Sequence, residues 1–236
     1  MSAFNHRYKL KVEALGKSFT LHNRGGVRVQ GFENVNFSLR CGELLALHGP
    51  SGAGKSSILK TIFRTYLADS GSIRFHRNNN PEVDLASCPE SHVLDLRRRE
   101  IGFVTQFLKI LPRVSALDAV AYPLIEIGTD EEQAKEEARK MLTQLGIREE
   151  LFKLSPLTFS GGEQQRVNIA RGIIAPKELI LLDEPTASLD QKSSEVVLRL
   201  LDQLKQRNIA MIAIFHDQRK IEQIADVAVA IGRNEI

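Results

Sequence analysis

Apolar residues form short runs along the chain, and these runs alternate with longer segments of helical spacing. Several runs are apolar at consecutive positions, as expected for strands that helices cover on both faces of a parallel sheet. The early strands have no helix between them and are predicted to be antiparallel, so a mixed α/β core is expected. The expected strands are Lys9–Ala14, Phe32–Leu39, Glu43–His48, Ser72–His76, Ile101–Thr105, Glu178–Leu182, Ala210–Phe215 and Val227–Ile231.

The segment from about 107 to 160 differs, because its pattern is helical and it contains no convincing strand. The run 129–132, Thr-Asp-Glu-Glu, offers a cap followed by acidic residues that suit a helix N-terminus. Apolar residues at helical spacing follow from Asp130 to Leu145, and Gly146 suits the end of that helix. We therefore predict an inserted helical lobe in a single domain of residues 1–236. The remaining parts, about 1–106 and 161–236, are predicted to form the core and a β lobe. The stretch 76–90 is rich in Asn and Pro and is predicted to be a surface loop.

The charge, the cysteine content and the length of the apolar runs argue against several classes of function. The net charge is only +3, and the one basic run, Arg97–Arg99, is interpreted as a solvated helix face or turn, so no nucleic-acid partner is expected. Cys41 and Cys88 lack metal-ligand spacing and are typical of reduced cysteines in a cytoplasmic protein. No apolar stretch approaches the roughly 18 residues that cross a bilayer. For a transport function, other chains must supply the membrane path.

The segment that begins at Gly49 follows the pattern G-x-x-x-x-G-K-[ST], between an apolar strand and a helical segment. Its glycines let successive amides turn toward an anion, and the following helix directs its positive end there. Lys55 adds a mobile positive charge for phosphates, and the Ser56 hydroxyl can bind Mg²⁺. This phosphate loop predicts ATP binding by Gly49, Pro50, Ser51, Gly52, Ala53, Gly54, Lys55, Ser56 and Ser57.

A second apolar strand ends in the carboxylates Asp183 and Glu184. Beside a phosphate loop, Asp183 is placed to hold Mg²⁺, as a Walker B aspartate does. Glu184 follows at once and is predicted to polarise the attacking water. Asp183 and Glu184 therefore turn a prediction of nucleotide binding into one of nucleotide hydrolysis.

The segment FSGGEQQR at 159–166 resembles the ABC signature, usually written LSGGQ. Gln106 matches the Q-loop glutamine of that family, which also binds the metal, and the run SLD that ends at Asp190 matches the D-loop. His216 matches the switch histidine. Phe19 is the best candidate to stack on adenine, with a core phenylalanine as the alternative. The predicted signature residues are Ser160, Gly161, Gly162 and Glu163, with Phe159 and Glu163 departing from the usual Leu and Gln.

This resemblance to ABC ATPases covers residues from about 9 to 230. It implies an α/β P-loop NTPase fold with a RecA-like core, an antiparallel β lobe and a helical lobe. It also implies ATP and Mg²⁺ as cofactors, and a head-to-tail dimer with a second ABC subunit, either a copy of itself or a paralogue. The phosphate loop of one subunit and the Ser160–Gln164 loop of the other would enclose one ATP.

The segments between the motifs resemble the PhnL-type ATP-binding subunits of the bacterial phosphonate C–P lyase system, most specifically QFLKILPRVSAL at 106–117. This resemblance implies a role beside α-D-ribose 1-methylphosphonate 5-triphosphate synthase, with C–P lyase core subunits as partners. The alternative is the motor of a lipoprotein-release or macrolide-export transporter, whose partner is a membrane permease. A DNA-repair or ribosome-associated ATPase is a weaker third class, because no coiled coil or second ABC domain is present. The surface of 107–120 is predicted to contact the partner.

Overall fold

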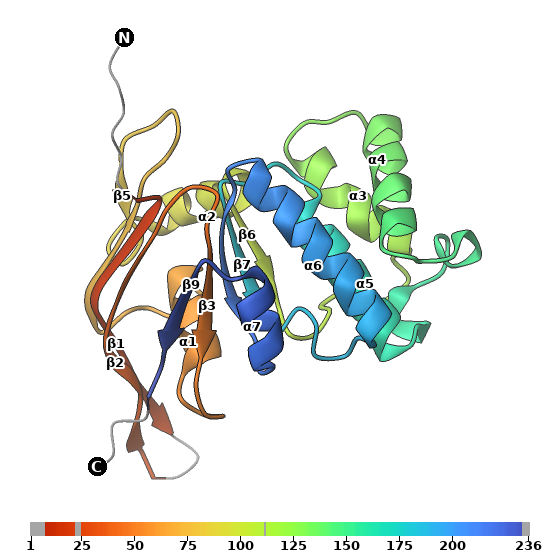
Figure 1. Cartoon of the computed structure of the whole chain (residues 1–236). Helices are drawn as coiled ribbons and strands as arrows, with labels where there is room; N and C mark the ends of the chain where they lie inside the picture. The colour runs from red at the N-terminus through yellow and green to blue at the C-terminus, as the bar shows by residue number, and fades with distance from the viewer. Residues whose placement is uncertain (1–7, 22–24, 111, 233–236) are drawn as a thin grey trace.

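The computed structural model describes residues 8–21, 25–110 and 112–232, so the ends of the predicted domain, 1–7 and 233–236, lie outside it. One of its two sheets has five parallel strands in the order β6-β7-β8-β3-β9 (Figure 1). Strands β3, β7 and β8 are built almost entirely from buried apolar residues, as the sequence predicted. The strands are β3 (Leu44–His48), β6 (Ile101–Val104), β7 (Leu179–Asp183), β8 (Ala210–Ile214) and β9 (Val227–Ala230).

The other sheet is antiparallel, in the order β2-β1-β4-β5. Its first strand is longer than the predicted Lys9–Ala14, and its second begins before Phe32. Register shifts interrupt the β1–β2 ladder after Val12, and Ala14 has a positive φ of 48°. Such bulges break the alternation of apolar and polar residues, so the full length of these strands could not be predicted from the sequence pattern. The strands are β1 (Leu10–Leu21), β2 (Val27–Leu39), β4 (Ser70–Phe75) and β5 (Val83–Asp84).

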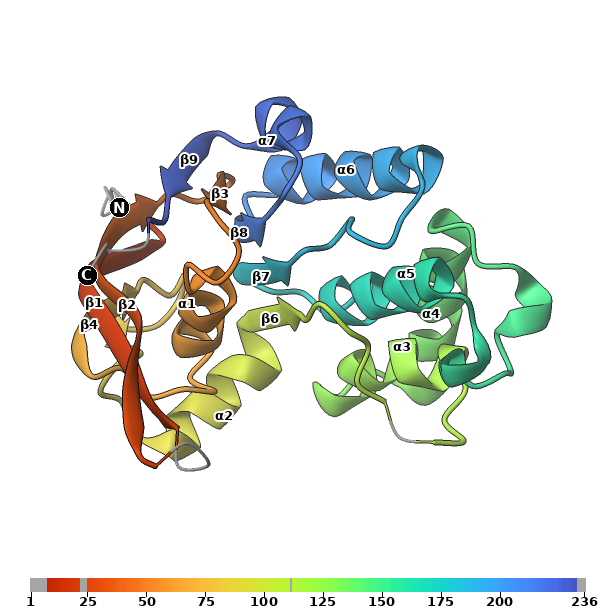
Figure 2. The same ribbon diagram turned by 90° about the horizontal axis from the view of Figure 1, so that it is seen from below.

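Helices α1, α2, α5, α6 and α7 lie around the parallel sheet (Figures 1 and 2). Alternate residues of its strands enter two hydrophobic clusters: Leu45 and Leu181 face α1 and the antiparallel sheet, whereas Ala46 and Leu182 face α5 and α6. The prediction of a plain loop at 76–90 was wrong, because β5 lies within it and α2 begins at its end. The helices are α1 (Lys55–Ile62), α2 (Glu90–Arg99), α5 (Gly161–Ile173), α6 (Gln191–Gln206) and α7 (Gln218–Ile224).

In its described part, the segment between β6 and α5 contains helices and no strand, and it lies on the side away from the antiparallel sheet (Figure 2). It contains α3 (Ala116–Glu126), α4 (Glu131–Gln144) and the 3₁₀ turns η2 (Glu149–Leu151) and η3 (Pro156–Thr158). The Asp130 carboxylate accepts hydrogen bonds from two amides of α4 and caps it. The residue bounds of the lobes stay a prediction. Within the described residues, no helix has the length and apolar character that crossing a bilayer demands.

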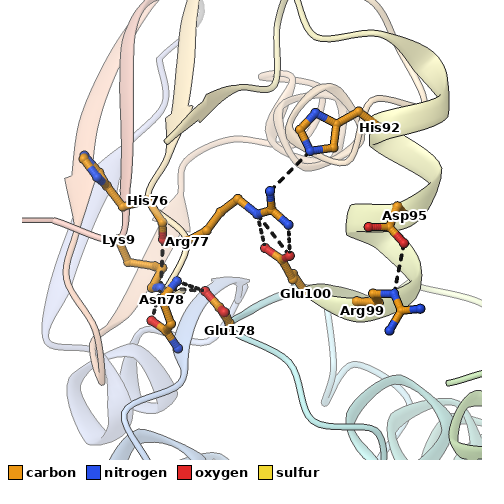
Figure 3. Close-up of polar contacts among 9 residues, drawn as sticks. All are labelled: Lys9, His76, Arg77, Asn78, His92, Asp95, Arg99, Glu100 and Glu178. Carbon is orange, nitrogen blue, oxygen red and sulfur yellow. Dashed lines mark hydrogen bonds and ion pairs between the residues drawn. The ribbon is translucent and has the colours of Figure 1, made fainter. Parts of the chain in front are cut away.

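A buried polar cluster fastens the antiparallel sheet to the start of β7 (Figure 3). Lys9 is 3% exposed, and its Nζ lies 2.8 Å from the Glu178 carboxylate and 2.7 Å from the Asn78 side-chain oxygen. Arg77 donates to both carboxylate oxygens of Glu100, which directly precedes β6. These bonds join residues far apart in the chain, so they fix the two sheets against each other at the end of β7 opposite Asp183.

Candidate active site

The phosphate loop connects β3 to α1 and lies tightly against two other backbone segments. At Gly49, with φ 137°, an added Cβ would lie 2.2 Å from the Ile231 carbonyl oxygen. At Gly54, with φ 89°, it would lie 2.3 Å from the Gly31 carbonyl oxygen. Both positions therefore require glycine, for space as well as for conformation. Ser51 and Gly52 form the turn between them, and Ser57 lies in the first turn of α1.

Lys55 is the first residue of α1, and its ammonium points back into the loop. Its Nζ donates to the carbonyl oxygens of Gly49 and Pro50, both at 2.8 Å. Burial lowers the pKa of Lys55, while the carboxylates of Glu184 and Asp183 act in the opposite direction. A cation held only by neutral carbonyls is free to change partners when an anion of higher charge arrives.

Ser56 and Asp183 bring two oxygen atoms together from α1 and β7. The Ser56 hydroxyl donates to the Asp183 carboxylate at 2.8 Å, and Asp183 is 3% exposed. Burial raises the pKa of Asp183, against the effect of the Ser56 hydrogen bond. Nowhere in the described ranges do three or more His, Cys, Asp or Glu side chains gather as for a metal ion. A two-residue oxygen set suits Mg²⁺, which keeps water and substrate phosphates as its other ligands.

Glu184 occupies the turn after β7 with a positive φ of 54°. Its carboxylate is held on both sides: the Gln106 amide donates to Oε2 at 3.1 Å, and His216 Nε2 lies 2.7 Å from Oε1. A left-handed conformation is costly for a residue with a Cβ, so this backbone is kept by its surroundings. The structure thus brings Gln106 and His216 together at Glu184, directly after Asp183, which contacts Ser56 of the phosphate loop. The roles of these side chains stay a prediction.

The signature segment lies at the start of α5, apart from this group. Ser160 and Glu163 form a capping box there. The Asp190 carboxylate caps α6, and a Cβ at Gly162 would lie 3.1 Å from the Ser188 carbonyl oxygen. Among the described residues, no hydrogen bond or ion pair joins Ser160–Glu163 to Lys55, Ser56, Gln106, Asp183 or His216. Within the described residues, the predicted signature residues therefore lie apart from the predicted phosphate and metal site.

Phe19 lies within β1 and packs edge-on against the Tyr66 ring, with centroids 5.1 Å apart. The Lys17 ammonium is 5.7 Å from the Phe19 ring centroid, and a Cβ at Gly31 would lie 2.6 Å from the ring. The ring is half-buried rather than a core residue. Its stacking on adenine stays a prediction.

Two residues that contact the predicted site, Gln165 and Asn168, were not predicted from the sequence. Gln165, 3% exposed, directs its side-chain amide at the Pro185 carbonyl oxygen at 3.3 Å, directly after Glu184. Asn168, one turn later, donates to the Thr105 carbonyl oxygen beside Gln106. Both lie on the buried face of α5. The sequence feature that could have identified them is the presence of amide side chains at otherwise apolar positions of α5, because a buried amide needs hydrogen-bond partners.

Strand β3, its glycine loop and α1 are arranged as in P-loop NTPases, and the acidic pair ends β7, which is separated from β3 by β8 in the same sheet. Residues 32–187 match the family model described as "ABC transporter". The chain is 35% identical over 214 residues to the lipoprotein-releasing system ATP-binding protein LolD of Legionella pneumophila, covering 90% of this chain and 92% of LolD. The methionine import protein MetN 1 of Acinetobacter baylyi is 32% identical, over 96% of this chain and 61% of its own length.

Solved structures agree with this assignment. A dimeric bacterial ABC transporter cassette, MJ0796, superposes with a TM-score of 0.86 at 27% identity, over 96% of both chains. Its dimeric post-hydrolysis state with ADP and phosphate gives a TM-score of 0.85 over 96% and 97%. The chain therefore belongs to the ABC ATPase family and is an ATP-binding, ATP-hydrolysing cassette, which confirms the predicted fold class.

Proposed function

We propose that the chain is the ATP-hydrolysing motor of a membrane ABC transporter of the lipoprotein-release or macrolide-export type. It would work in the cytoplasm as a head-to-tail dimer of two copies. The observation that carries the proposal is the division of the site: the phosphate loop with Asp183 and Glu184 is one part, and the Ser160–Glu163 loop is another. Two antiparallel copies would unite the parts twice. The LolD relatives, which the chain matches over nearly their full length, support the transporter assignment.

ATP would bind along the phosphate loop and the N-terminus of α1. Its phosphates would replace the carbonyl oxygens of Gly49 and Pro50 as partners of Lys55. Phe19 would stack on the base. Ser56, Asp183 and Gln106 offer the oxygen ligands for Mg²⁺, which when bound would neutralise charge on the phosphates.

Hydrolysis would depend on the side chains that surround Glu184. In its fixed orientation the carboxylate can position a water and accept its proton. His216, already within hydrogen-bond distance of Glu184, can donate to the charge that develops on the transferred phosphoryl group. Because Gln106 and His216 hold the Glu184 carboxylate from both sides, catalysis would consist mainly of positioning and electrostatic stabilisation.

The second half of the site would come from the partner copy. Ser160, Gly161, Gly162 and Glu163 of one copy would face the terminal phosphate bound to the other, with Asp190 close to the interface. The dimeric state of MJ0796 with ADP and phosphate supports this arrangement. Hydrolysis would remove the anion that bridges the copies, and the dimer would open.

The membrane permease would dock on the surface that follows Gln106. Phe107 is 70% exposed directly after Gln106, so a partner that contacts it is one residue from a side chain bonded to Glu184. Close by is a cavity of about 610 Å³. It is lined by Lys109, Ile110, Val114, Asp118, Ala119, Tyr122 and Arg171. Its apolar wall suits a short helix of a permease. Most of these residues belong to the 107–120 segment, whereas Tyr122 lies further along α3 and Arg171 lies in α5. Leu111 of the 107–120 segment lies outside the described residues.

The second candidate is the ATP-binding subunit of the phosphonate C–P lyase system, acting beside α-D-ribose 1-methylphosphonate 5-triphosphate synthase. The resemblance of the 106–117 segment favours it, because this segment forms the proposed partner surface. The same cavity would then receive a helix of a C–P lyase core subunit. The two candidates share the ATPase cycle and differ in the partner.

A Glu184→Gln variant tests both the ATPase mechanism and the identity of the partner. We expect it to bind ATP, to lose hydrolysis and to form a stable dimer with ATP, as seen by light scattering. Normal turnover by this variant would refute the role of Glu184. Tagged Glu184→Gln protein, produced in its native cells with ATP, should then retain a membrane permease. Recovery of C–P lyase subunits instead would replace the first candidate by the second. A Tyr122→Glu variant should lose either partner.

A further inference from the structure

The signature serine is already bonded within its own chain. The Ser160 hydroxyl donates to Oε2 of Glu163 at 2.6 Å, and the Ser160 amide donates to the same oxygen at 3.0 Å. The Glu163 amide closes the box with a long contact of 3.4 Å to the hydroxyl oxygen. Ser160 therefore uses its one hydroxyl hydrogen on a carboxylate of its own helix.

Glu163 carries its negative charge at this point. The hydrogen bonds from Ser160 hold the pKa of Glu163 below its usual range, so the side chain is ionised at neutral pH. The nearest guanidinium on the helix, Arg166, donates to the carbonyl oxygens of Leu145 and Gly146 at the end of α4. Its hydrogen bonds thus go to backbone carbonyl oxygens, while its charge acts on Glu163 through space and contributes less than Ser160 to the lowered pKa of Glu163. A carboxylate also offsets the positive end of α5, where the first amides point outward.

We propose that Glu163 is a positioning residue that opposes dimer closure, by competing with the partner copy's ATP for the Ser160 hydroxyl and for the positive end of α5. This inference rests on the shared site of the proposed function. One hydroxyl cannot donate fully to two acceptors, so the terminal phosphate must displace the carboxylate. The two anions also repel each other at the short distance that closure imposes. The threshold concentration of ATP for closure is therefore set partly by Glu163.

The simpler role for Glu163 is helix capping alone. A capping box accepts Gln as well as Glu at this position, because the amide oxygen can receive the same bonds from Ser160. Glu163→Gln therefore keeps the cap and removes only the charge. Capping alone predicts no change in closure for this variant, whereas competition predicts easier closure.

The test uses full-length chains that carry Glu184→Gln, so that the closed dimer accumulates. Glu163→Gln is compared with Glu137→Gln, which removes an exposed carboxylate from α4. Light scattering gives the ATP concentration at which half of the protein is dimeric. We expect Glu163→Gln to lower this concentration about tenfold, because two ATP bind per dimer and each shared site gains about tenfold in affinity when a like charge at ~6 Å is removed at an effective dielectric constant of about 40. Glu137→Gln should leave it unchanged.

Equal ATP requirements for Glu163→Gln and Glu137→Gln would overturn the inference while the dimer formed by Glu184→Gln keeps the proposed function intact. If Glu184→Gln alone stays monomeric with ATP, the shared site itself is wrong and the inference falls with it. Thermal unfolding of the Glu163→Gln protein without nucleotide provides the second readout. An unchanged melting temperature shows that the cap is retained and that the altered closure comes from charge.

Discussion

The Nε2 atom of His216 lies 2.7 Å from the Oε1 atom of Glu184. The two residues follow β8 and β7, which are neighbours in the parallel sheet, so their side chains meet where the carboxyl ends of both strands lie together. The Glu184 side chain is 16% exposed and that of His216 is 49% exposed. The histidine therefore forms the solvent-facing side of a carboxylate that is otherwise enclosed.

Replacing His216 by Ala tests whether this contact serves catalysis. We expect kcat for ATP hydrolysis to fall by about 10²–10³, since a donor to the transferred phosphoryl group and an orienting partner of Glu184 are both lost. ATP affinity should stay within about threefold, because binding uses the phosphate loop. Steady-state hydrolysis and nucleotide titration measure the two quantities. The control is His92→Ala, whose ring lies beside Arg77 and away from the site; unchanged kcat in His216→Ala would exclude the proposed role.

Lys55→Ala should weaken ATP binding by tenfold or more. The Lys55 ammonium donates to two neutral carbonyl oxygens, which anionic phosphates can replace as acceptors. The positive charge of Lys55 would then contribute directly to ATP affinity. The measurement is the rise in melting temperature with added ATP, which follows from affinity by mass action. Lys60→Ala, on the same helix, is the matched control. A thermal shift in Lys55→Ala as large as in the native chain would contradict the phosphate-loop assignment.

The parts of the site that depend on short spacing could be predicted from the sequence. Lys55 and Ser56 come from one loop, and Asp183 and Glu184 from one strand end, so local chemistry specified them. The overall alternation of strands and helices specified the α/β class in the same way. Gln165 was missed because its partner is the turn after β7, and only the folded chain brings that turn to α5.

The connections between distant segments could not be predicted. Lys9 and Glu178 are 169 positions apart, and neither belongs to a motif, yet they form a partly buried ion pair. The length of β1 was underestimated for a related reason. Its bulges near Ala14 are stabilised by pairing with β2 and β4 on both sides, and this pairing is invisible in the strand's own pattern.

Lys9→Met should destabilise the fold by about 2–4 kcal/mol, because it leaves the Glu178 carboxylate partly buried without its cation. The measurement is urea unfolding at neutral pH. The double variant Lys9→Met, Glu178→Met should recover part of this loss, since it removes the unpaired charge as well. ATP affinity of either variant should remain close to that of the native chain. A single variant as stable as the native chain would show that the cluster in Figure 3 does not fasten the sheets.

The lowered pKa of Lys177 leads us to expect a specific change of the free energy of unfolding with pH. Its Nζ donates to the carbonyl oxygens of Arg97 and Arg98 at the end of α2, and Arg98 in turn binds the Glu126 carbonyl oxygen at the end of α3. Burial nevertheless lowers the pKa of Lys177 to about 8, from an ordinary value of 10.5. Between these values the unfolded chain holds the proton and the folded chain releases it, so the free energy of unfolding rises with pH.

We therefore compare the native chain with Lys177→Met by urea unfolding from pH 7 to pH 10. The difference in free energy of unfolding should be constant below pH 8 and should move in favour of the native chain above it, because only the native chain has this group to deprotonate. Other lysines and the tyrosines titrate in both proteins, so their contributions cancel in the difference. Parallel stability curves over the whole range would show that the Lys177 ammonium is as well solvated in the folded chain as in the unfolded one.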